Sequence, residues 1–175
     1  MSFLSRLFMR TTDPRESVRP LWHQVVALSR DPALYAKCGV ADTVEGRFDM
    51  IVHVLSLALL RMEQSAALAP LTAPLTELFV TDMDGQLRES GVGDVGVSKQ
   101  MGKLMGALGG RIGALRTALA SPDEALLIAA VERNVHWNAA PDVRDASALA
   151  ARLRVLAGRM AASSDADILA ARIAA

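Results

Sequence analysis

The sequence predicts an all-α protein, a single-domain bundle of about seven or eight helices. Apolar residues make up 51% of the 175 residues but aromatic residues only 4%, so the apolar content is mostly Ala, Leu, Val and Met. Ala, Leu and Met favour helices, and the aromatic residues that enrich strands are scarce. Apolar residues recur at helical spacing along the chain, and we find no alternating strand pattern of useful length.

The first helices are marked by aspartates followed by prolines. Asp13-Pro14-Arg15-Glu16 offers a capping carboxylate, a proline in the first turn and a glutamate, and an apolar stripe covers residues 18–28. Pro20 lies inside this stripe, where it marks either a kink or a second helix start. Asp31-Pro32 begins a short helix that should end at Gly39.

The longest helix should cover residues 43–68. It begins at a capping box, Asp42-Thr43-Val44-Glu45. Its apolar residues form one face and widen beyond it, so we expect this helix to be central and buried on more than one side. Pro70 and Pro74 break the chain, and the next helix should cover about residues 75–90.

A glycine-rich loop at residues 91–96 precedes a helix expected over about residues 98–119. The loop has the letters of a dinucleotide-binding motif, but a helix precedes it and Asp94 would put negative charge among phosphates, so we interpret it as a turn. The helix spaces three glycines four residues apart, Gly102, Gly106 and Gly110. Because glycine in a helix interior costs about 1 kcal/mol, this spacing indicates a close contact with another helix.

The sequence predicts three further helices in the C-terminal part. Ser121-Pro122-Asp123-Glu124 begins a helix over about residues 122–138, an Ala-rich helix follows over about 143–161, and a short helix covers about 165–173. We divide the chain into an N-terminal amphipathic segment (1–12), a helical domain (13–162) and a C-terminal short helix or tail (163–175).

Charge and hydropathy limit the classes of partner. The net charge is +0, which argues against a nucleic-acid partner. An acidic stretch at residues 77–94 precedes a basic one at 98–116, and these either pair internally or form a surface of two signs. No stretch reaches the ~18–20 apolar residues of a membrane-spanning helix. Residues 1–10 combine apolar and arginine side chains, which predicts either a peripheral membrane contact or a docked N-terminal helix.

No catalytic or metal-binding motif is evident. The single cysteine, Cys38, excludes an internal disulfide and a cysteine-built metal site. The three histidines belong to no metal-ligand motif. His53 lies four residues after Asp49, which predicts either an ion pair along the helix or a hydrogen-bonded core histidine. We therefore expect no enzyme activity, no metal and no cofactor.

Two segments resemble the signature of the ubiquinol–cytochrome c chaperone family. That family typically shows a tyrosine, a Gly-Val pair, an Asp-Thr pair and a Gly-Arg-Phe-Asp that opens a long apolar helix. The corresponding residues here are Tyr35, Gly39-Val40, Asp42-Thr43 and Gly46-Arg47-Phe48-Asp49. The second segment contains Met83-Asp84, Leu87-Arg88-Glu89 and Gly91-Val92-Gly93-Asp94 in the family's order. The resemblance covers about residues 13–138, and we find nothing specific in the Ala-rich C-terminal part.

The resemblance implies a bacterial chaperone that helps to build respiratory complex III. Its implied partner is newly made cytochrome b or a complex III assembly intermediate, and its implied place is the cytoplasm, with peripheral contact at the inner membrane. In mitochondria such proteins act with a small partner near the ribosomal exit, but this chain shows no strongly basic patch for RNA. The alternative is a generic helical adaptor or scaffold that binds a soluble protein.

The resemblance also implies a client or signature surface built from the two segments. Its candidate residues are Asp42, Gly46, Arg47, Phe48, Asp49, Asp84, Arg88, Glu89, Gly91, Gly93 and Asp94. We expect Gly46 to permit the close approach of another element. We also expect Arg47 to pair with Asp84 or Asp94 and so to join the two segments.

Overall fold

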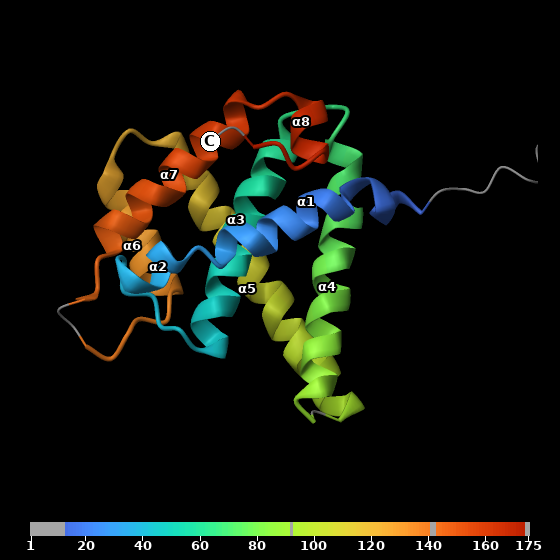
Figure 1. Ribbon diagram of the computed structural model, residues 1–175, viewed down its shortest axis with the longest axis horizontal. Helices are drawn as coiled ribbons and strands as arrows, with labels where there is room; N and C mark the ends of the chain where they lie inside the picture. Colours follow the sequence, from blue (N-terminus) through green and yellow to red (C-terminus); the bar gives the residue numbers. More distant parts are fainter. Residues whose placement is uncertain (1–12, 92, 141–142, 174–175) are drawn as a thin grey trace, which may run out of the picture.

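The computed structural model describes residues 13–91, 93–140 and 143–173, and in these ranges the chain is a bundle of eight α-helices (Figure 1). The helices are α1 (Pro14–Ser29), α2 (Pro32–Ala36), α3 (Val44–Glu63), α4 (Thr72–Glu89), α5 (Asp94–Ala120), α6 (Glu124–Asn134), α7 (Ala146–Ala162) and α8 (Asp165–Leu169), with a 3-10 turn η2 (Ala69–Leu71) before α4. The prediction of an all-α bundle is confirmed. The N-terminal segment 1–12 lies outside the described residues.

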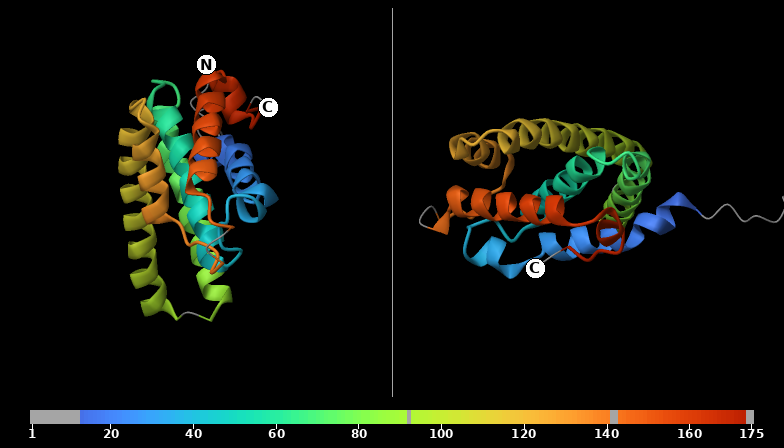
Figure 2. Two further views of the ribbon diagram at one scale, coloured as in Figure 1. Left: turned by 90° about the vertical axis from the view of Figure 1, so that its left-hand side faces the viewer. Right: turned by 90° about the horizontal axis from the view of Figure 1, so that it is seen from above.

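Helix α3 is the centre of the bundle, as its apolar pattern predicts. Seen from above, it lies between a layer that contains α5 and α6 and a layer that contains α1 and α7 (Figure 2). Every residue from Asp49 to Leu59 is buried. The helix therefore places even its polar side chains inside the protein, where each needs a hydrogen-bond partner.

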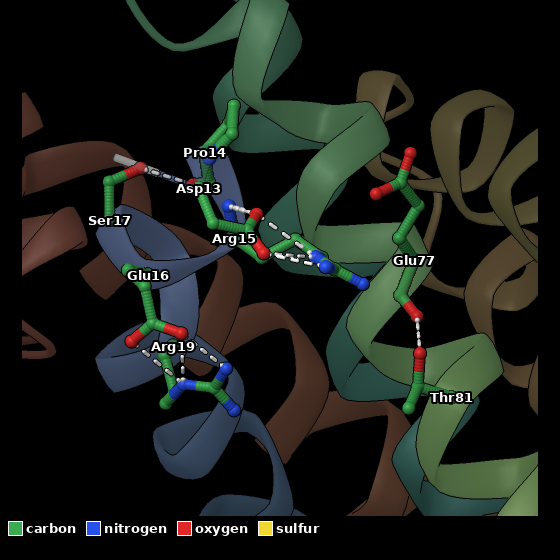
Figure 3. Close-up of polar contacts among 8 residues, drawn as sticks. All are labelled: Asp13, Pro14, Arg15, Glu16, Ser17, Arg19, Glu77 and Thr81. Atoms are coloured by element: carbon green, nitrogen blue, oxygen red, sulfur yellow. Dashed lines mark hydrogen bonds and ion pairs between the residues drawn. The ribbon is translucent and has the colours of Figure 1, made fainter. Parts of the chain in front are cut away.

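The first turn of α1 shows how local sequence fixes a helix end (Figure 3). The Asp13 carboxylate accepts the backbone N–H of Arg15 at 2.9 Å and the Arg15 guanidinium at 2.6 Å. The hydrogen bonds from Arg15 lower the pKa of Asp13 to about 2. The helix then continues through Pro20 to Ser29, so the alternative of a second helix start at this proline is wrong.

Several helix ends differ from those predicted. Helix α4 begins at Thr72 and includes Pro74, because a proline in the first turn has no intrahelical bond to lose. Helix α5 begins at Asp94, directly after its N-cap Gly93, so the loop is shorter than predicted. Helix α3 ends at Glu63 rather than near residue 68.

The ends of α6 and α7 are set by pairing with a distant segment. Helix α6 ends at Asn134 rather than near residue 138, because Val40 and Trp137 form an isolated antiparallel bridge. The backbone N–H of Asp145 donates to the Cys38 carbonyl at 3.0 Å, and α7 starts only after this residue. Long-range backbone bonds thus replace local helical ones.

The predicted close contact of the α5 glycines is wrong. A Cβ atom built on Gly102, Gly106 or Gly110 meets nothing within 4 Å. These glycines face open space, and the buried side of α5 is formed by other residues, among them Leu108, Arg111 and Leu115.

Helices α4 and α5 form a hairpin whose tip lies at one end of the molecule, below α3 in Figure 1. The N-terminal end of α3 points towards the same end. The two signature segments, at the start of α3 and the end of α4, thus belong to one region of the fold. None of the described helices combines the length and the apolar character needed to cross a membrane.

Candidate functional site

A groove of about 490 Å³ lies where the two signature segments meet. Its apolar lining comes from three helices: Val44, Phe48 and Ile51 of α3, Met83 and Leu87 of α4, and Leu104 of α5. Arg30, Arg47, Gln86, Glu89 and Ser90 complete the lining. A cavity of this size, mostly apolar with a few polar groups, is typical of a binding site.

Helical spacing explains why these side chains share one surface. Val44, Phe48 and Ile51 are separated by four and three residues, and Met83 and Leu87 by four, so each set lies on one helix face. Val44 is 79% exposed although it is a large apolar residue. Burial by a partner would remove this apolar surface from water.

Arg47 forms a wall between the groove and a neighbouring hollow. Its guanidinium donates to the Asp42 carboxylate at 2.7 Å, and this bond lowers the pKa of Asp42. The hollow, of about 520 Å³, is lined by Arg30, Tyr35, Asp42, Arg47 and four further residues. Arg30 and Arg47 thus belong to both cavities.

The expected ion pair between Arg47 and Asp84 or Asp94 is wrong. Arg47 forms an ion pair with Asp42. Arg88 pairs with both of the other acids, at 2.7 Å from Asp84 and 2.6 Å from Asp94. These bonds raise the pKa of Arg88. Both arginines therefore pair with acids that lie within six residues of them in the sequence, and neither joins the two segments. The two signature segments meet through the apolar lining of the groove.

The buried carboxylate of Asp49 supports the floor of the groove. It accepts hydrogen bonds from the Arg111 guanidinium, from the backbone N–H of His136 at 2.8 Å and from Nδ1 of His136 at 2.6 Å. Arg111 also donates to the Asn134 carbonyl at 2.7 Å and lies 5.9 Å from the centre of the Phe48 ring. Asp49 is therefore a structural residue that joins α3 to α5 and to the segment after α6.

His53 is a hydrogen-bonded core histidine and does not form an ion pair. Its Nδ1–H donates to the backbone carbonyl of Asp49 at 2.7 Å. Burial lowers its pKa to about 4, so the ring is neutral at physiological pH. Of the two interpretations of the Asp49–His53 spacing, the core histidine is confirmed and the helical ion pair is wrong.

Gly46 permits a close approach, as predicted. A Cβ atom at this position would lie 2.0 Å from the Ala41 carbonyl oxygen, far inside van der Waals contact. The backbone N–H of Ala41 in turn donates to the His136 carbonyl at 2.9 Å. The glycine lets the chain before α3 fold back against the helix while it pairs with the segment after α6.

The remaining signature residues form the turn at the tip of the hairpin. Gly91 has φ +84°, a conformation that favours glycine, and Gly93 is the N-cap of α5. Glu89 ends α4 and lines the groove. The Arg88 ion pairs hold Asp84 and Asp94 on either side of the turn.

The sequence thus predicted only part of the groove. Arg47, Phe48 and Glu89 line it. Gly46, Asp49 and the ion pairs of Arg88 with Asp84 and Asp94 lie outside the lining and hold the surrounding helices and turn in place. The apolar lining residues Val44, Ile51, Met83, Leu87 and Leu104 were missed, as was Arg30. The helical spacing of apolar residues inside both signature segments was the signal that could have found most of them.

Metal binding receives no support from the described part of the chain. Within it, no group of three or more His, Cys, Asp or Glu residues is placed to hold a metal ion. The buried thiol of Cys38 has a pKa raised by desolvation, which makes it a poor nucleophile.

Comparison with known families identifies the protein class. The sequence pattern described as ubiquinol-cytochrome C chaperone matches residues 36–175. The chain belongs to the ubiquinol–cytochrome c chaperone family. The crystal structure of the Cbp3 homolog from Brucella abortus is similar, with 34% identity, a TM-score of 0.79, and coverage of 98% of this chain and 96% of that one. A comparison with curated proteins gives no significant match.

The family assignment confirms the resemblance and extends it. The two signature segments pointed to the family, and the match also includes the Ala-rich helices α7 and α8, whose sequence carries no specific resemblance by itself. Membership makes the protein a chaperone for the ubiquinol–cytochrome c complex.

Proposed function

We propose that this protein is a non-enzymatic assembly chaperone that binds newly made cytochrome b, and that the groove between α3 and α4 is its client site. The observation that carries the proposal is the apolar lining, which both signature segments build together. An unassembled membrane protein exposes apolar helix faces, and a groove of this kind can cover such a face until the partner subunits arrive.

The lining suits a client whose surface varies during assembly. Met83 contributes a flexible thioether side chain to the lining of the groove. Methionine side chains are flexible and adapt to different apolar partners. The polar rim of Arg47, Gln86 and Glu89 keeps the empty groove compatible with water.

A peripheral membrane contact through residues 1–10 is part of the same proposal, with the protein at the cytoplasmic face of the inner membrane. It is supported by the apolar and basic residues of this segment. Flotation of the full chain with anionic vesicles should be weakened by Phe8→Asp. Equal flotation of both proteins, or none of either, would contradict the contact.

Site-specific cross-linking in native cells tests the client site. A photoreactive amino acid replaces Leu87 in the groove or, as the control, Leu126 of α6, which is 44% exposed and lies outside the groove. After irradiation, the tagged protein is purified in detergent and its cross-linked partners are identified by mass spectrometry. We expect cytochrome b to be cross-linked from position 87 and not from position 126.

The same experiment separates the alternative function. Cross-links from position 87 to soluble proteins, without cytochrome b, would favour a generic adaptor. Cytochrome b cross-linked equally from both positions would show contact with the client but would remove the groove as its specific site.

A further inference from the structure

Two charged side chains at the rim of the groove have no ion-pair partner among the described residues. Arg30 directly follows α1, and Glu89 is the last residue of α4. Both line the groove. In the described chain ten other arginines pair with a carboxylate, whereas Arg30 and Glu89 leave one positive and one negative charge of the groove lining available to a partner.

The two charges lie at different edges of the groove. The C-terminal end of α1 lies beside the middle of the bundle, whereas the C-terminal end of α4 lies at the tip of the α4–α5 hairpin (Figure 1). The same groove also has an apolar lining from Phe48, Met83 and Leu87, so a partner would meet both charges and this apolar surface. The third charged rim residue, Arg47, is already neutralised by Asp42.

We infer that the groove binds a helical protein segment with one apolar face, an acidic side chain at the end that meets Arg30 and a basic side chain at the end that meets Glu89. This inference rests on the proposed client groove and adds the charge pattern and orientation of its occupant. An arginine can bind a carboxylate through two parallel hydrogen bonds. Complementary charges at a rim set register and partner choice more than total affinity.

Three synthetic helical peptides test the charge pattern. They share one apolar face and differ at their ends: one is acidic at one end and basic at the other, one is acidic at both ends and one is basic at both. Fluorescence anisotropy at low salt, where screening is weak, measures their binding to the full chain. The proteins are the wild type, Arg30→Glu, Glu89→Arg and the double variant.

Arg133→Glu is the matched control. Arg133 belongs to α6, is exposed, has no ion-pair partner among the described residues and does not line the groove. Circular dichroism establishes that each variant is folded before binding is measured.

The wild type should bind the mixed peptide about fivefold more tightly than either uniform peptide, as expected for exposed charge pairs. Arg30→Glu should prefer the basic peptide, Glu89→Arg the acidic peptide, and the double variant again the mixed one. Arg133→Glu should behave as the wild type.

If all variants ranked the three peptides in the same order, the inference would be overturned, because Arg30 and Glu89 would then not decide which peptide the groove prefers. Failure of the wild type to bind any peptide would overturn it as well. The cross-linking of cytochrome b from position 87 is measured separately. If that cross-link forms while the charge preference is absent, this inference fails alone and the proposed function stands.

Discussion

Arg111 of α5 and Asp49 of α3 form an ion pair that is almost completely buried, with side-chain exposures of 9% and 1%. The pair lies beside the Phe48 ring, which lines the groove. A charge removed from water is stable only if its partners are in place. This pair therefore links the rigidity of the groove floor to the packing of α3 against α5.

Removal of the negative charge at Asp49 should strongly destabilise the protein. Asp49→Asn leaves the buried Arg111 without its counter-charge, and we expect a loss of about 3–5 kcal/mol in the free energy of unfolding. The control is Asp42→Asn, which breaks the exposed Arg47–Asp42 pair and should cost less than about 1 kcal/mol. Urea denaturation measures both. Equal losses of stability in both variants would show that the buried pair matters no more than the exposed one.

Substitution by alanine should change the stability of the protein in opposite directions at Gly46 and Gly106. Gly46→Ala puts a methyl group 2.0 Å from the Ala41 carbonyl oxygen, so we expect destabilisation of about 1–3 kcal/mol. Gly106→Ala has open space around its Cβ atom and should stabilise α5 by up to about 1 kcal/mol. Thermal unfolding followed by circular dichroism tests the pair. Destabilisation by Gly106→Ala would mean that α5 needs this glycine for a contact.

The buried His53 should make stability depend on pH. Its pKa is about 4 in the folded protein and about 6.5 in the unfolded chain. Between these values the unfolded chain binds the additional proton, so the free energy of unfolding falls as the pH falls from 6.5 to 4, by up to about 3 kcal/mol. The contribution is complete above pH 6.5.

His53→Gln should reduce this dependence, since glutamine does not titrate and can still donate to the Asp49 carbonyl. The measurement is urea denaturation of both proteins between pH 4 and pH 7. Parallel curves for the two proteins would exclude His53 as the source.

The helices that the sequence predicted well are those with local signals. Asp13, Asp31 and Asp123 each accept a backbone N–H at the start of their helix, as the spacing of capping residue and first turn indicates. The central position of α3 followed from an apolar face too wide for a surface helix. These features depend on residues that are close in sequence.

The features that were missed depend on residues far apart in sequence. The end of α6 is decided by the pairing of Trp137 with Val40. The partner of Asp49 is Arg111, 62 positions away. A single sequence also does not show which side of α5 is covered, so the spacing of its glycines predicted a contact that the fold does not make.

The candidate site shows the same difference between features set by nearby residues and features set by distant ones. The resemblance indicated two segments whose residues line one groove in the fold. It did not separate residues that line the groove, such as Phe48, from those that support it, such as Asp49 and Gly46. That separation depends on which face of each helix stays open after α3, α4 and α5 have packed.

A role of the groove in complex III assembly can be tested through the cytochrome b content of cells that lack the gene. Such cells are complemented with the wild type, Leu87→Asp in the groove or Leu126→Asp on α6, with all three proteins present in equal amounts. Reduced-minus-oxidised spectra of membranes then measure cytochrome b. We expect normal cytochrome b levels with the wild type and Leu126→Asp and a severalfold lower level with Leu87→Asp. Normal cytochrome b in cells with a stable Leu87→Asp protein would show that the groove is not needed for assembly.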